Sequence, residues 1–190
     1  NVGEVTNTGV EFVLNTANTV GDFKWNTSFN VAYNRNEVTK LSDGQDLIDP
    51  GSSRLMNVVK LGQPIGVFWG AEYAGVNPDN GDPLWYTNKE GSGRATTSDY
   101  SEAEFVALGN PSPEWIGGVT NTFDWKGFNL SIQFQGVFGN VIHNAAGSFM
   151  SANGDWFDNQ TRDQLDRWQQ PGDITDVPRA IFISGHGTQS

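Results

Sequence analysis

Polar and apolar residues alternate with a period of two from Phe23 to Asn34, which is typical of a β-strand with one apolar and one polar face. The apolar face carries Phe23, Trp25, Thr27, Phe29, Val31 and Tyr33. A similar alternation runs through Val10, Phe12 and Leu14, and a glycine beside an aspartate at residues 21–22 lets the chain reverse between the two runs. The pattern therefore predicts a hairpin over residues 9–34.

A second hairpin is predicted near the other end of the chain, over residues 115–140. Its apolar positions alternate with polar ones and are Val119, Phe123, Trp125, Phe128, Leu130, Ile132 and Phe134. Lys126 and Gly127 separate the two runs, which is the length of a tight turn, and glycine can adopt the positive φ that such turns require.

The segments between and after the hairpins are rich in Gly, Asn, Asp and Pro and predict long loops. Residues 35–114 form one long excursion, with a small hairpin around the turn at 77–82, and residues 141–190 form another loop. Helix-compatible residues from Asn159 to Trp168, followed by Pro171, predict one short helix. We expect no complete membrane crossing within 35–114, although a descending strand at 66–76 with an irregular return stays an alternative.

Very short turns that alternate with very long loops are typical of outer-membrane β-barrels. A crossing strand needs roughly 9–11 residues, and the run from Phe23 to Tyr33 has 11. Aromatic residues lie at the strand ends, as two membrane interfaces require, and the opposite faces carry mostly Asn, Ser, Thr and Gln, which suits a wet lumen.

We therefore predict an all-β chain: an antiparallel transmembrane β-barrel fragment of about four spanning strands, with long extracellular loops and tight periplasmic turns. The residues predicted to face lipid are Phe23, Trp25, Phe29, Val31, Tyr33, Phe123, Trp125, Phe128, Leu130, Ile132 and Phe134. A soluble secreted β-sandwich that binds carbohydrate explains the alternation equally well, with the apolar face turned inward, and is the alternative.

Composition removes several other classes. The chain has 11 Lys and Arg against 22 Asp and Glu, and the net charge of −11 disfavours a nucleic-acid partner. It contains no cysteine, which excludes disulfides, thiolate metal sites and cysteine nucleophiles. No apolar run approaches the roughly 18 residues of a membrane-spanning helix.

Several stretches resemble the SusC/RagA-type family of TonB-linked outer-membrane proteins, in an order and spacing that cover nearly the whole chain. They are Gly9-Val10-Glu11-Phe12, Asn30 to Arg35 (NVAYNR), Gly62-Gln63-Pro64-Ile65-Gly66 followed by Phe68-Trp69-Gly70, Gly109-Asn110-Pro111-Ser112-Pro113, and Phe134 to Asn140 (FQGVFGN). The resemblance implies a segment from the late part of a roughly 22-stranded, plugged barrel.

The resemblance also implies a function for the whole protein. Family members sit in the bacterial outer membrane and import oligosaccharides or peptides. A surface lipoprotein of the SusD type closes over the extracellular mouth, and TonB supplies energy through a plug domain that we expect to lie outside this segment. This piece would supply barrel wall, contact with outer-membrane lipid and part of the mouth, without a cofactor and without catalysis.

Candidate chemical sites in the loops are weak. His143 and His186 match no metal-ligand spacing, and the turn at 79–82 resembles a calcium loop but lacks its later glutamate. The carboxylates that could serve a glycosidase are Asp155, Asp158, Asp163 and Asp166, and a solvated face is the simpler interpretation.

Exposed loop aromatics could stack on sugars or pack against the lid lipoprotein, or could simply hold the loops together. They are Trp69, Trp85, Tyr86, Trp156 and Trp168.

Overall fold

The computed structural model describes residues 3–49, 56–87, 93–152 and 159–180. The chain divides into two compact units, the first formed by residues 1–68 and 109–142 and the second by residues 69–108 and 143–190. Within the described residues, no helix is long and apolar enough to cross a bilayer.

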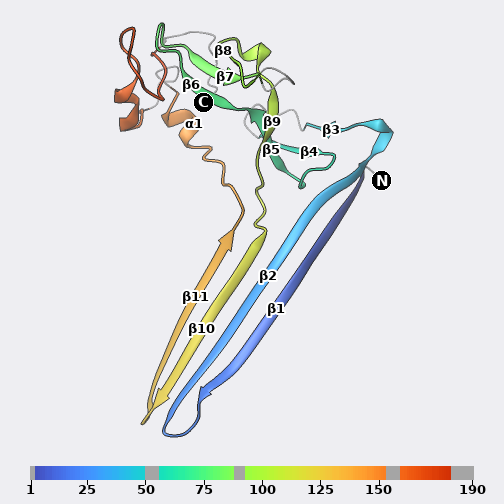
Figure 1. Ribbon diagram of the computed structural model, residues 1–190, viewed down its shortest axis with the longest axis vertical. Helices are drawn as coiled ribbons and strands as arrows, with labels where there is room; N and C mark the ends of the chain where they lie inside the picture. Colours follow the sequence, from blue (N-terminus) through green and yellow to red (C-terminus); the bar gives the residue numbers. More distant parts are fainter. Residues whose placement is uncertain (1–2, 50–55, 88–92, 153–158, 181–190) are drawn as a thin grey trace. The chain divides into compact units, whose positions relative to one another are not determined.

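The first unit is built on one antiparallel sheet of four long strands, in the order β1-β2-β10-β11 (Figure 1). These strands are β1 (Gly3–Thr19), β2 (Phe23–Leu41), β10 (Trp115–Trp125) and β11 (Phe128–Phe138). β2 pairs with β10 across the middle of the sheet, with Tyr33 opposite Trp115 and Phe23 opposite Trp125. Two sequence-local hairpins are thus joined into one sheet although about 75 residues separate them in the chain.

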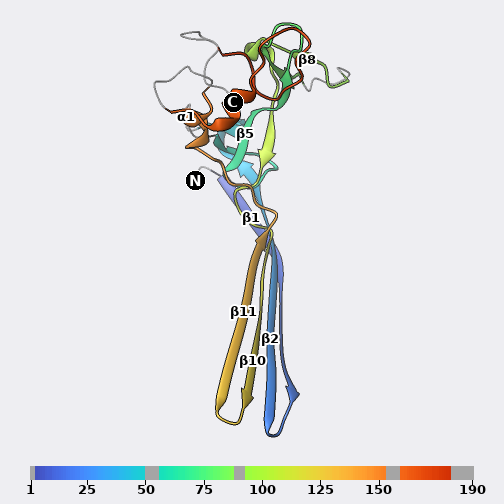
Figure 2. The ribbon, with the colours of Figure 1, turned by 90° about the vertical axis from the view of Figure 1, so that its left-hand side faces the viewer.

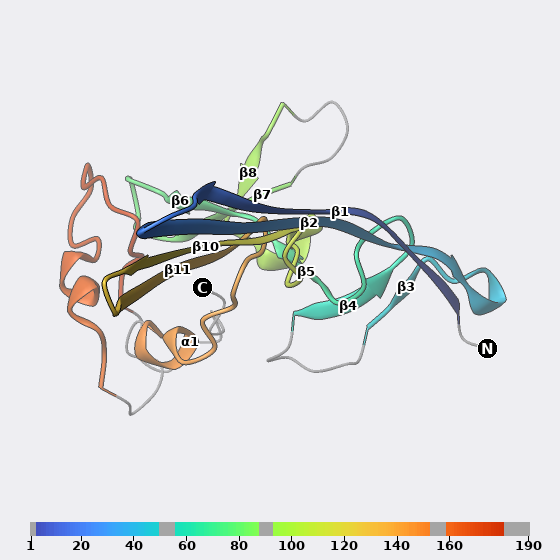
Figure 3. The same cartoon turned by 90° about the horizontal axis from the view of Figure 1, so that it is seen from below.

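Both tight turns lie at the same end of this sheet, as Figure 2 shows. The turn between β10 and β11 consists of Lys126 and Gly127, whose φ angles of 47° and 89° are both positive. Two positive φ angles are what a two-residue type I′ turn requires, and such a turn matches the twist of the strands that it joins. The twist is visible when the sheet is viewed from below (Figure 3).

At the opposite end, β2 runs past Asn34, where the predicted excursion was expected to begin, and continues to Leu41. The extension forms because β2 stays paired with β1 over its last residues, where Thr6 lies opposite Glu37 and Gly3 lies opposite Leu41. Val38 also exchanges backbone hydrogen bonds with a later turn: its N–H donates to Gln63 O, and Gly62 N–H donates to its carbonyl, both at 2.9 Å. Val38 is the most buried of the unit's described side chains, at 1% exposed. It lies in a small core whose other members are Leu41, Val58, Val67 and Phe68.

Short strands frame this core. They are β3 (Leu47–Ile48), β4 (Asn57–Lys60) and the first residues of β5 (Val67–Ala71), and a 3₁₀ turn, η1 (Ser42–Gly44), precedes them. β4 pairs antiparallel with both β3 and β5.

The second unit contains the small antiparallel sheet β6-β7-β8, with β6 (Tyr73–Val76), β7 (Pro83–Tyr86) and β8 (Thr96–Thr97). The 3₁₀ turn η2 (Tyr100–Glu102) and β9 (Phe105–Gly109) follow. The described strands between β2 and β10 have two to five residues, fewer than the roughly 9–11 that a membrane crossing needs.

The helix expected over residues 159–168 is shorter than predicted, and a second one was missed. The chain forms a five-residue 3₁₀ helix, η3 (Arg162–Asp166), and a four-residue α-helix, α1 (Gly147–Met150). η3 stays short because its flanks are extended and bonded elsewhere: Thr161 N–H donates to Met150 O at 2.8 Å, and Trp168 N–H donates to Val177 O at 2.9 Å.

Candidate functional site

The register of the four-stranded sheet gathers its apolar side chains on one face. Residues directly opposite each other on antiparallel strands point to the same face, and neighbours along a strand point to opposite faces. The pairs Trp25–Phe123, Phe29–Val119 and Val119–Phe134 therefore share a face. All eleven residues predicted to face lipid lie on this surface, hereafter the apolar face: Phe23, Trp25, Phe29, Val31, Tyr33, Phe123, Trp125, Phe128, Leu130, Ile132 and Phe134. Val10, Phe12, Leu14, Trp115 and Phe138 extend it.

The apolar face is open. Phe128 is 77% exposed, Phe134 64% and Leu130 56%, although each is a large apolar side chain. Water-soluble domains rarely expose a contiguous apolar surface of this kind, so the face requires an apolar environment or a covering partner. A β-sandwich would bury such a face under a second sheet.

Two rows of rings delimit the apolar face. The row nearest the turns contains Phe23 and Trp125, and the row at the far end contains Tyr33 and Trp115, whose ring centroids are 4.7 Å apart. Ten residue steps separate Phe23 from Tyr33, which is about 33 Å along a strand, or about 25 Å along the normal of a bilayer at a tilt of ~40°. The apolar band of outer-membrane barrels is also about 25 Å tall.

Ring contacts hold the row at the turn end together. Phe123 stacks with Phe23 at 6.2 Å and with Trp25 at 5.9 Å between centroids. The Lys126 ammonium lies 5.1 Å from the ring of Trp125, beyond the row on the side of the turn. Aromatic rings with a cation beside them are what an interface between lipid and water favours.

One polar row interrupts the apolar face, and the sequence analysis missed it. Asn121 accepts hydrogen bonds through Oδ1 from Thr27 Oγ1 at 2.7 Å and from Trp25 Nε1 at 3.0 Å. Thr27 Oγ1 in turn accepts from Asn18 Nδ2 at 2.6 Å. The Trp25 N–H and the Thr27 hydroxyl thus find partners within the row, which lowers the cost of placing them in an apolar environment. The signal in the sequence was Asn121 between Val119 and Phe123.

The opposite face of the sheet, hereafter the polar face, is neutral over its central rows. Asn30, Ser28 and Asn26 on β2 lie opposite Gly118, Thr120 and Thr122 on β10, and Gln135, Gln133 and Ser131 follow on β11. Charged residues lie on either side of these rows: Lys24 is opposite Asp124 toward the turns, and Glu11 is opposite Ala32 toward the other end. Short amide and hydroxyl side chains on a half-open surface are suited to contact with water or with a polar ligand.

In the second unit, Trp168 holds the long C-terminal loop to the turn between β6 and β7. Its Nε1–H donates to Pro78 O at 3.0 Å, and its ring lies directly over Gly81. A Cβ at Gly81 would lie 2.5 Å from the ring, and the φ of this residue is +77°, so the position requires glycine on both counts.

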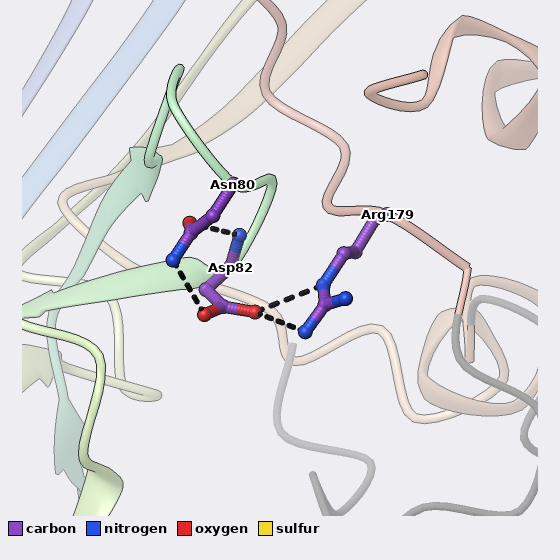
Figure 4. A network of polar contacts seen from close by, with 3 residues as sticks. All are labelled: Asn80, Asp82 and Arg179. Atoms are coloured by element: carbon purple, nitrogen blue, oxygen red, sulfur yellow. Dashed lines mark hydrogen bonds and ion pairs between the residues drawn. The ribbon is translucent and has the colours of Figure 1, made fainter. Parts of the chain in front are cut away.

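An ion pair fixes the same contact (Figure 4). Asp82 accepts through Oδ1 from two N–H groups of Arg179, at 2.9 and 3.0 Å, and through Oδ2 from Asn80 Nδ2 at 2.9 Å. Nearby, the Tyr73 hydroxyl donates to Asp176 O at 2.9 Å. Burial, and secondarily the charge of Asp176, raise the pKa of Tyr73 to about 12. Both carboxylate oxygens of Asp82 accept hydrogen bonds from Arg179 or Asn80. The turn at 79–82, which resembles a calcium loop in sequence, therefore acts as a structural turn.

The other loop aromatics differ in how much of each side chain is exposed to solvent. Trp85 is only 6% exposed and packs edge-on against Tyr100, so it supports the loop unit from within. Tyr86 is half-buried, and the Arg94 guanidinium lies 3.8 Å above its ring and pairs with Glu72 at 2.9 Å. Trp69 is half-buried, and Trp156 lies outside the described residues.

Comparison with known proteins decides the family. No family model matches the chain. The chain is 34% identical over 200 residues to TonB-dependent receptor P3 of Formosa agariphila, an alignment that covers 94% of this chain and 19% of that receptor. It is 26% identical over 155 residues to TonB-dependent receptor SusC of Bacteroides thetaiotaomicron, covering 75% of this chain and 15% of SusC.

A solved structure of the RagAB peptide transporter matches with a TM-score of 0.83 and 31% identity, over 95% of this chain and 20% of that chain. The chain belongs to the SusC/RagA-type family of TonB-dependent receptors. It spans about a fifth of the length of these relatives.

Membership in the SusC/RagA-type family establishes the fold as a β-barrel fragment and removes the β-sandwich alternative. The loop carboxylates, which were considered as glycosidase residues, agree with membership in a family of transporters. Asp163 is exposed, and hydrogen bonding, chiefly from Thr161, lowers its pKa, whereas a general acid needs a raised one. His143 is half-buried, and His186, Asp155 and Asp158 lie outside the described residues.

Proposed function

We propose that this chain forms part of the wall and extracellular mouth of an outer-membrane importer that depends on TonB. The observation that carries the proposal is the apolar face. With the strands tilted by ~40°, its two aromatic rows lie about 25 Å apart along the bilayer normal, which is the height of the apolar band of outer-membrane barrels. In this proposal the apolar face contacts lipid and the polar face lines the lumen. We assign the chain a role in transport and no catalytic role.

The tight turns face the periplasm and the long loops face the outside. The asymmetry supports this orientation, because two- and three-residue turns lie at one end of the sheet and all long connections leave from the other. The segment contains no cysteine, so a cysteine introduced into it is the only one in this part of the receptor.

The orientation is tested in intact cells that express the full-length receptor. A membrane-impermeant maleimide should label cysteine at Asp79 in a loop and should fail to label cysteine at Lys126 in a turn until the outer membrane is permeabilised. Labelling of the Lys126 position alone in intact cells would reverse the orientation.

The substrate is an oligosaccharide or a peptide, and a SusD-like surface lipoprotein covers the mouth. The neutral hydroxyl and amide side chains of the polar face support a hydrophilic substrate, and the relatives include both SusC and the RagAB peptide transporter. Trp69 and Tyr86, which are half-buried in the loop unit, are the aromatics best placed to meet substrate or lid.

Import is tested with radiolabelled oligosaccharides and oligopeptides in cells with and without the receptor gene. Uptake of one class that requires both the receptor and TonB supports the proposal and names the substrate. Uptake that persists without TonB, or that does not depend on the receptor for either class, contradicts it.

A further inference from the structure

The apolar face contains a groove of about 570 Å³ near its far aromatic row. Gly117 and Gly136 lie opposite each other on β10 and β11, and Gly117 also lies opposite Val31, so one row of the face lacks two side chains. The Phe138 ring covers Gly136, which leaves the open part of the row at Gly117. The side chains that line the groove on this face are Phe29, Val31, Trp115, Val119, Phe134 and Phe138. None of these six side chains carries a charge.

Polar groups appear at one end of the groove. Tyr33 and Trp115 form the aromatic row beside it, and within the described part of the chain neither the Tyr33 hydroxyl nor the Trp115 indole N–H has a hydrogen-bond partner. Two donors at the edge of an apolar groove suit a ligand whose polar end begins where its apolar end stops.

A cation follows in the same direction. Arg35 is two residues beyond Tyr33 on β2, which places it on the same face and about 7 Å further along the strand. Its guanidinium pairs with Glu37 at 3.1 Å, and its side chain remains 65% exposed. A guanidinium has five N–H donors, so one surface ion pair leaves donors for a second anion such as phosphate.

We propose that this groove binds a phosphorylated glycolipid of the outer leaflet, of the lipid A class. One saturated acyl chain occupies the hollow above Gly117, the Tyr33 and Trp115 donors meet the sugar oxygens, and Arg35 meets a phosphate. The order of apolar groove, neutral donors and cation along one direction of the strand is complementary to such an amphipathic anion. The outer leaflet follows from the orientation proposed above, on which this inference rests.

The test uses full-length receptor purified from outer membranes in mild detergent and native mass spectrometry with purified bisphosphorylated lipid A as the probe. Val31→Phe fills the hollow from its wall without a change of backbone. Leu130→Phe, opposite Phe123, adds a ring on the same face outside the groove and away from Tyr33. We expect Val31→Phe to lower lipid A occupancy at least fivefold and Leu130→Phe to leave it unchanged. Arg35→Gln should lower it severalfold.

The proposal is overturned if Val31→Phe retains as much lipid A as the unchanged receptor. It is also overturned if equimolar phosphatidylethanolamine displaces lipid A. Folding of each variant is checked by its heat-dependent shift in gel mobility, and Arg35→Gln decides the matter if Val31→Phe does not fold. A receptor that never reaches the outer-membrane fraction would instead contradict the proposed function, before any lipid is measured.

Discussion

Replacing Phe29 by arginine tests directly which face of the sheet contacts lipid. Phe29 is six residues from Phe23 in the turn-end row and four from Tyr33 in the far row. Six steps correspond to about 20 Å along the strand and about 15 Å along the normal, so Phe29 lies within about 3 Å of the middle of a 25 Å band. An arginine on the lipid face near the midplane costs roughly 2–4 kcal/mol. This lowers the folding equilibrium roughly 30- to 900-fold.

Three controls isolate the cause. Phe29→Ala removes the ring, including its contact with Phe12 at 6.3 Å, without adding charge. Phe138→Arg makes the same change in the far aromatic row, where the cost should fall to about 0–1 kcal/mol. Ser28→Arg places the charge on the polar face next to Phe29, where we expect a small effect.

The assay is urea unfolding of the full-length receptor in lipid vesicles, together with assembly into the outer membrane of cells. The expected order of destabilisation is Phe29→Arg, then Phe29→Ala, then Phe138→Arg. Ile132→Arg, at nearly the same distance from the midplane on β11, should resemble Phe29→Arg. Normal assembly of both Phe29→Arg and Ile132→Arg would refute the assigned facing, and greater damage from Ser28→Arg would invert it.

Three further changes probe polar contacts. Asn121→Ala removes the acceptor of the Trp25 N–H on the apolar face and should cost about 1–3 kcal/mol, measured by the same unfolding titration. Gly81→Ala should displace the Trp168 ring and speed proteolysis of the loops without affecting membrane assembly. The pKa of Tyr73 is raised from 10.0 to about 12 in the folded state, which therefore favours the neutral phenol. The contribution of Tyr73 to the stability of the folded loop is complete below pH 10 and is lost as the pH rises from 10 to 12. Near-ultraviolet circular dichroism should show a loop transition in that window, and Tyr73→Phe should weaken it.

The apolar face was predictable because strand periodicity is a local property. Side chains alternate with a period of two whatever the rest of the chain does, so Phe23 to Tyr33 and Phe128 to Phe134 could be assigned to one face of their strands from the sequence. That the two hairpins pair with each other through β2 and β10 was not contained in that pattern, because pairing depends on residues far apart in the chain.

The ends of the elements and the roles of loop residues depend on tertiary contacts. Strand β2 extends to Leu41 because its last residues pair with β1 as far as Gly3 and because the turn at 62–63 bonds to Val38, and both partners lie outside residues 35–41. Trp168 could equally have been a ligand contact or a packing residue until Gly81, 87 residues earlier, was found beneath its ring. Residues 159–168 have a composition compatible with a helix, but only a short 3₁₀ helix forms there, because its flanks are hydrogen-bonded to other segments.

The sheet also explains why these experiments need the whole receptor. Among the described strands, β1 and β11 are each paired along one side only, so each leaves a row of backbone N–H and C=O groups without a strand partner in this sheet. In a lipid environment such groups must be satisfied by a further strand, because no water is available to bond them. A closed barrel supplies that partner on both sides, as the match to the RagAB peptide transporter supports. The effect of Phe29→Arg on stability is therefore defined only when the outer edges of β1 and β11 are both paired. The isolated 190 residues should aggregate through these two edges, so that an effect of the substitution on lipid contact could not be measured.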